Sequence, residues 1–133
     1  DHDEAAERLQ EKMAERFPGV SRAQWRAFSR RCWDEAPDGL ALRYDARLRE
    51  AVLEGAQGGV LPDLWPLFDA LAGKPLGLIR GANSDLLSAE TAAEMRRRRP
   101  DMVFAEVPDR GHVPFLDEPE SVAAIAAWLD RVA

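Results

Sequence analysis

Hydrophobic residues recur at helical spacing through the first third of the chain. One stripe repeats every four residues and is flanked by acidic and basic positions, which predicts an amphipathic helix that ends at Pro18-Gly19. A second helix is predicted from Ser21, because Ser21 and Gln24 form a capping-box pair ahead of an apolar face. Trp25 belongs to that face, and Trp33 is expected beside it on the same helix. The first stripe consists of Ala5, Leu9, Met13 and Phe17.

Turn-forming residues divide the segment that follows. Pro37-Asp38-Gly39 predicts a turn, and residues 40–44 suit a short extended segment. A third helix is expected to end at Gly55, and residues 57–59 predict a flexible break. We therefore expect residues 1–73 to form one mainly helical region.

The second half of the chain changes to short apolar runs that alternate with helices. Residues 75–79 and 102–107 are nearly continuous apolar runs, which is typical of strands buried on both faces. Ser88 suits the cap of a helix after the first run, and Pro119 suits the first position of a helix after the second. This order predicts an α/β fold over residues 74–133, with two parallel strands joined by a crossover helix. The expected apolar face of the last helix is Val122, Ile125, Leu129 and Val132.

A carboxylate and an imidazole follow the two predicted strands at their carboxyl ends, where open α/β sheets place their sites. Asp85 lies in the loop after the first strand, and His112 lies in the loop after the second. An Asp that accepts a proton from a His fixes its tautomer and stabilises the imidazolium during general-base catalysis. The residues alone leave a structural alternative open, in which Asp85 forms a turn and His112 is a surface side chain.

Other chemically capable side chains fit structural roles better. Asp109 suits a turn, and Ser88 suits a helix cap. Ser84 adjoins Asp85 on the same loop, so we do not expect it to act as a nucleophile. A metal site is not expected, because His112 has no second His or Cys ligand at a useful spacing.

These motifs resemble a known family. The sequence from Pro75 to Asp85 resembles the acid-bearing strand and loop of the α/β-hydrolase superfamily, and Gly111-His112-Val113-Pro114 with Glu118-Pro119 resembles its histidine loop and final helix. Residues 17–25 and 42–45 are similar to the helical cap that many members insert before the acid strand. The resemblance implies a partial α/β-hydrolase fold with two parallel strands and flanking helices, preceded by a helical cap region.

The same resemblance implies roles for individual residues. Asp85 is the expected acid of the catalytic triad, and His112 is the expected general base. Trp25 and Trp33, on the cap, are expected to line a substrate pocket. The implied substrate is a small, rather apolar ester, lactone or similar molecule, and no cofactor is implied.

The chain also departs from the family pattern. It contains no Gly-x-Ser-x-Gly elbow to carry a nucleophilic serine. We therefore expect the C-terminal part of a hydrolase, inactive alone, although a non-catalytic interaction module derived from a hydrolase remains the alternative. Two parallel strands leave unpaired edges, which predicts association with a missing N-terminal half or with a second copy.

Composition narrows the possible partners and location. The 133 residues carry 18 Lys and Arg against 24 Asp and Glu, and the net charge of −6 argues against general nucleic-acid binding. Cys32 is the single cysteine and excludes an internal disulfide. No apolar run approaches the about 20 residues of a membrane helix. Because the first residues lack Met and a leader pattern, we expect the chain to be a piece of a longer protein. Together with the charge, the single cysteine and the short apolar runs, this leads us to expect a cytoplasmic protein without membrane or nucleic-acid partners.

Overall fold

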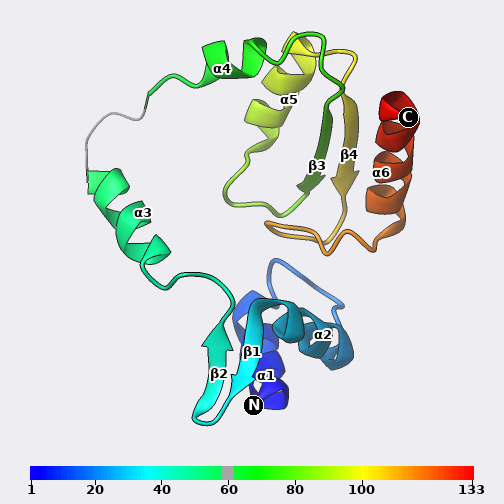
Figure 1. Cartoon of the computed structure of the whole chain (residues 1–133). Helices are drawn as coiled ribbons and strands as arrows, with labels where there is room; N and C mark the ends of the chain where they lie inside the picture. Colours follow the sequence, from blue (N-terminus) through cyan, green and yellow to red (C-terminus); the bar gives the residue numbers. More distant parts are fainter. Residues whose placement is uncertain (58–61) are drawn as a thin grey trace. The chain divides into compact units, whose positions relative to one another are not determined.

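The computed structural model describes residues 1–57 and 62–133 (Figure 1). The described chain forms two compact units, the first made of residues 1–12 and 20–63 and the second of residues 13–19 and 64–133. Most of the break predicted at residues 57–59 lies outside the described residues. The elements are α1 (His2–Met13), α2 (Arg22–Cys32), β1 (Trp33–Ala36), β2 (Gly39–Leu42), α3 (Leu48–Gln57), α4 (Trp65–Asp69), β3 (Gly77–Gly81), α5 (Ala89–Arg98), β4 (Val103–Val107) and α6 (Pro119–Val132).

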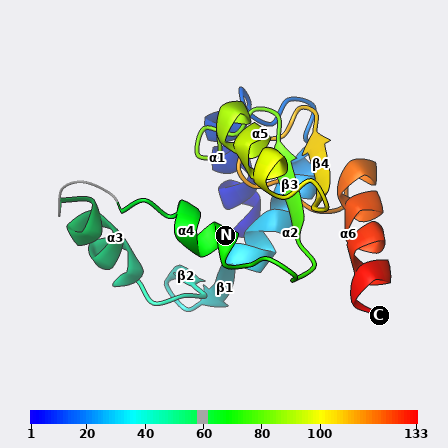
Figure 2. The same ribbon diagram turned by 90° about the horizontal axis from the view of Figure 1, so that it is seen from above.

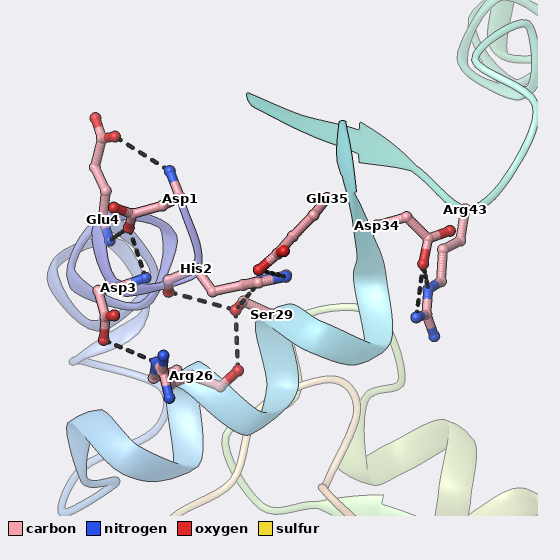
Figure 3. Close-up of polar contacts among 9 residues, drawn as sticks. All are labelled: Asp1, His2, Asp3, Glu4, Arg26, Ser29, Asp34, Glu35 and Arg43. Atoms are coloured by element: carbon pink, nitrogen blue, oxygen red, sulfur yellow. Dashed lines mark hydrogen bonds and ion pairs between the residues drawn. The ribbon is translucent and has the colours of Figure 1, made fainter. Parts of the chain in front are cut away.

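Polar contacts join α1 to α2 in the first unit (Figure 3). His2 Nδ1 lies 2.9 Å from the hydroxyl of Ser29, and both residues are buried. At the surface, Arg26 Nε lies 2.9 Å from a carboxylate oxygen of Asp3. Because a buried polar group is costly without a partner, the His2–Ser29 contact fixes how these two helices pack.

The predicted capping box of α2 is confirmed, since Ser21 and Gln24 bond reciprocally across the first turn. The placement of Trp33 on this helix is wrong. Trp33 has extended backbone angles and begins β1, which pairs antiparallel with β2 from Trp33 opposite Leu42 to Ala36 opposite Gly39. Pairing across the turn makes residues 33–36 a strand, although their own sequence has no strand pattern.

The second unit contains the predicted parallel pair of strands, which lie side by side in Figure 1. β3 and β4 run parallel from Gly77 opposite Val103 to Gly81 opposite Val107. The connecting helix α5 begins at the predicted cap, because Ser88 accepts a hydrogen bond from the backbone N–H of Thr91. In both views α5 and α6 lie on opposite sides of this sheet (Figures 1 and 2).

Helix α6 is only partly covered by the sheet. Ser121 and Ala124 are buried, and the Trp128 indole donates to the carbonyl of Pro75 at 3.2 Å. The expected apolar face is not buried within this chain, since about half of each of three of its side chains is exposed. Two strands are too narrow to cover a helix of this length. The exposed side chains are Val122, Leu129 and Val132.

Substitution of Trp25 tests how much this buried side chain contributes to the free energy of unfolding of the first unit. Its side chain is 1 % exposed and packs edge-to-face on Phe28, with ring centroids 5.9 Å apart. We expect Trp25→Ala to lower the free energy of unfolding by about 3–5 kcal/mol, the usual cost of emptying a buried aromatic site. The matched control is Trp33→Ala, which removes a half-buried tryptophan of the same unit and is expected to cost less. Urea unfolding followed by circular dichroism measures both, and equal losses would contradict the assignment.

Candidate active site

The loops after β3 and β4 are tied together by their backbones. The N–H of Ala82 donates to the carbonyl of Val107, and the N–H of Asn83 donates to the carbonyl of Arg110, both at 2.9 Å. The pairing of the strands therefore continues beyond their ends into the loops that carry Asp85 and His112. This brings the two candidate residues onto neighbouring loops at the carboxyl edge of the sheet, as the sequence predicts.

Gly81 allows this close approach. A Cβ atom at residue 81 would overlap the carbonyl groups of Arg110 and Gly111. Any side chain there would push the acid loop and the histidine loop apart. The requirement for glycine at the end of β3 is thus steric.

In the described structure, the carboxylate of Asp85 pairs with Arg16, with Oδ2 2.8 Å from Nη1. The side chains of both residues are nearly half exposed. His112 is exposed, and within the described residues no hydrogen bond joins His112 to Asp85. The direct contact between acid and histidine remains a prediction.

Residues 13–19 form a turn that contacts both loops, although the sequence predicts most of them as the end of the first helix. Helix α1 ends at Met13, and the backbone carbonyl of Arg16 accepts a hydrogen bond from the Asn83 amide at 3.1 Å. Phe17 is buried with Phe115 at a centroid distance of 5.5 Å, and its ring also packs against Gly111. Residues 13–19 thus hold the acid loop and the histidine loop at once. No local sequence pattern indicates this role, because the contacts span most of the chain.

Glu118 organises the end of the histidine loop. Its carboxylate, 7 % exposed, accepts hydrogen bonds from the backbone N–H groups of Phe115 and Leu116, both at 3.0 Å. It also accepts from Arg110 Nε and from the Ser121 hydroxyl, both at 2.9 Å. One buried carboxylate therefore joins the start of the loop, its end and the first turn of α6.

These contacts control the ionisation of Glu118. Burial alone raises the pKa of this carboxyl, but the hydrogen bonds from Phe115, Ser121 and Arg110 outweigh burial and lower its pKa below the ordinary 4.5. The ionised form is therefore the one that the folded loop favours.

The two serines near the acid hold loop structure. The hydroxyl of Ser84 accepts a hydrogen bond from the backbone N–H of Leu87 at 3.1 Å. Ser88 caps α5. Both hydroxyls therefore stabilise the segment between β3 and α5. Within the described residues, no group of three or more His, Cys, Asp or Glu side chains is placed to hold a metal ion.

The two tryptophans assigned to substrate binding lie in the first unit in different settings. Trp25 is enclosed in the interior. Trp33 lines a hollow of about 410 Å³ between α1 and the β1–β2 hairpin, together with Leu9, Leu40 and Arg8. A role in substrate binding remains a prediction for both residues.

Known proteins with a similar sequence or structure identify the fold of this chain. No family model matches the chain. An α/β hydrolase from Novosphingobium aromaticivorans has a crystal structure that matches 98% of this chain with a TM-score of 0.85 and 40% identity. The chain has a partial α/β-hydrolase fold. The crystal structure of E-2-(acetamidomethylene)succinate hydrolase shares the fold at 22% identity, with a TM-score of 0.61 over 96% of this chain.

A curated relative points the same way. The 3-hydroxybutyrate-oligomer hydrolase of Cupriavidus necator is 40% identical in an alignment of 95 residues that covers 67% of this chain. This chain covers 32% of the length of that relative, and 46% of the length of both the Novosphingobium hydrolase and the E-2-(acetamidomethylene)succinate hydrolase. Among the described residues no helix is long and apolar enough to cross a membrane.

Glu118 gives a pH-dependent prediction. Because its pKa is lowered by folding, its contribution to stability is present above about pH 4.5 and is lost as the pH falls through the folded-state value. We expect Glu118→Gln to lower the free energy of unfolding by about 1–3 kcal/mol at neutral pH, since a buried charged acceptor is lost. The difference between wild type and variant should shrink on acidification below pH 4.5.

Urea unfolding across this pH range measures the effect. Glu120→Gln is the matched control, because Glu120 is an exposed carboxylate in the first turn of the same helix. A pH-independent difference between wild type and Glu118→Gln would contradict the assignment.

Proposed function

We propose that this chain supplies the acid and the histidine of an α/β hydrolase that cleaves small, rather apolar esters or lactones. The observation that carries the proposal is the backbone tie between the loops of Asp85 and His112 at the carboxyl ends of two parallel strands. The 40% identity to the Novosphingobium hydrolase supports it, because that similarity extends over nearly the whole chain.

The proposed reaction needs a serine from outside these residues. The serine oxygen attacks the ester carbonyl carbon while His112 takes the hydroxyl proton, and His112 then gives that proton to the departing alcohol oxygen. Water repeats the sequence on the acyl-enzyme, with His112 again as base, and releases the acid. Asp85 holds His112 in the productive tautomer and stabilises the imidazolium.

The Arg16–Asp85 ion pair is compatible with this role. Exposed ion pairs contribute about 1 kcal/mol or less, so a change of partner at Asp85 costs little.

The substrate class rests on a relative. The Cupriavidus protein is named for hydrolysis of 3-hydroxybutyrate oligomers, which are aliphatic esters. We extend only the ester class to this chain.

A second candidate is a non-catalytic interaction module derived from a hydrolase. The observation that favours it is the engagement of Asp85 by Arg16 instead of by His112. In this alternative the acid loop is held by an ion pair for structural reasons only.

Substitution of the two loop residues separates the candidates. In a protein that joins this chain to its nucleophile-bearing part, we expect Asp85→Asn and His112→Ala each to lower kcat for p-nitrophenyl butyrate by at least about a hundredfold. Asp109→Asn is the control, since Asp109 is an exposed turn residue at φ 56° that Asn also tolerates. Absence of hydrolysis by the unsubstituted protein, or activity that survives both loop substitutions, would favour the interaction module.

We further propose that the chain associates through the open side of β3. A groove of about 300 Å³ beside that strand is lined by apolar residues that include Leu76, Ile79 and Ile125. Together with the exposed face of α6, it is the kind of surface that another part of a hydrolase core or a second copy covers.

If the chain associates with a second copy through this surface, one charged side chain placed on the surface should weaken the association. We expect the chain alone to sediment above its monomer mass, and Leu129→Lys to shift it toward the monomer, because a charge placed in a buried apolar contact is costly. Ala123→Lys is the matched control, since Ala123 is an exposed α6 residue outside the expected apolar face. Sedimentation equilibrium measures both, and a monomeric wild-type chain at all concentrations would refute self-association.

A further inference from the structure

A hollow rich in arginine lies at the outer edge of β4. Its volume is about 630 Å³, and its lining comes from α5, from β4 with its lead-in, and from α6. Because α5 and α6 lie on opposite sides of the sheet (Figure 2), a hollow that touches both helices and β4 lies at the edge of the sheet. We call it the arginine hollow; its defining residues are Arg96, Arg97, Arg131, Phe104, Met102 and Ala127.

The backbone of β4 has free hydrogen-bonding groups on this side. The N–H of Val103 donates to the carbonyl of Leu76, and the carbonyl of Val107 accepts from Ala82, so both of these β4 residues face β3. Since the direction alternates along a strand, the N–H and C=O of Phe104 and Glu106 point outward. Within the described residues no strand pairs with them.

Two cations flank these free groups, and neither forms a salt bridge among the described residues, although the charge of Arg131 adds to the lowering of the Asp101 pKa that the hydrogen bond from Arg99 mainly causes. The guanidinium of Arg96 lies 4.5 Å from the centre of the Phe104 ring, a stacked geometry that leaves its N–H donors free at the edge of its plane. Arg131 donates to the backbone carbonyl of Asp101, whose carboxylate is engaged by Arg99. Arg97, by contrast, is paired with Glu94. In a chain of net charge −6, this is a local concentration of available positive charge.

The two edges of the sheet differ in a way that indicates which one stays open. The groove beside β3 is apolar, and a strand edge of that kind joins the interior of a larger sheet. The β4 edge is lined by charge, as edges that face solvent commonly are. The rest of a hydrolase core therefore fits the β3 side and leaves the β4 side accessible.

From these observations we propose that the outer edge of β4 binds an acidic peptide segment in extended conformation. The peptide pairs its backbone with Phe104 and Glu106 and places carboxylates against Arg96 and Arg131. Addition of a strand to an open edge gives affinity through the main chain, and the arginines select acidic side chains. A second copy fits less well, because two-fold pairing of β4 edges brings like charges together.

The test uses the 133-residue chain and a fluorescein-labelled peptide of Glu and Thr. We expect Arg96→Gln/Arg131→Gln to weaken binding by about tenfold or more, measured by fluorescence anisotropy. The matched control is Arg30→Gln/Arg49→Gln, which removes the same charge from exposed helix positions elsewhere and should change affinity by less than about twofold. Should the first variant lose its native circular dichroism, Arg96→Lys/Arg131→Lys replaces it and should keep most of the affinity.

Two further measurements test the strand pairing itself. The amide resonances of Phe104 and Glu106 should shift on peptide addition, and a peptide with N-methylated backbone amides should bind at least about tenfold more weakly. No measurable binding, equal losses in both glutamine variants, equal binding of a Lys and Thr peptide, or unchanged affinity after N-methylation would each overturn the proposal. If the wild-type chain does not bind the peptide and Arg96→Gln/Arg131→Gln self-associates, the arginines serve only to prevent the β4 edge from pairing with a second copy.

Discussion

The candidate site depends on the parallel backbone pairing of β3 and β4. The ladder fixes the two strand ends at the same level, and the bonds from Ala82 and Asn83 carry the pairing into the loops. Because this tie is made by main-chain groups, it does not depend on the identity of the functional side chains. Gly81 sets the steric condition for it, since the opposing carbonyl groups occupy the place of a side chain.

Local signals in the sequence were sufficient for much of the second unit. Apolar runs, the serine cap of α5 and the proline at the start of α6 all act over a few residues. Helices α5 and α6 begin at their signals and β4 lies within its run, whereas β3 lies two residues later than its run, at Gly77–Gly81. The capping box of α2 also forms at its signal. The fold class and the neighbouring positions of the Asp85 and His112 loops could therefore be predicted.

Features that depend on contacts distant in sequence could not be predicted. The strand at Trp33 exists only because residues 39–42 pair with it. No sequence pattern marks Arg16 as a partner of Asp85. The two residues form an ion pair because residues 13–19 pack with the second unit, which contains Asp85. Glu118 belongs to the segment that resembles the histidine loop and final helix of the family, but the four donors to its carboxylate become apparent only when the loop is folded.

The two halves of the candidate site are held with different strength. Glu118 is buried and fully bonded, so the histidine loop has a fixed frame. Asp85 is exposed and held by one exposed arginine, an interaction that water and salt weaken. A triad needs an oriented acid, and orientation of Asp85 toward His112 therefore requires that the surroundings of the acid loop change or become enclosed. In the proposed hydrolase, the part that brings the serine would also exclude water from Asp85, and this links completion of the site to completion of the core.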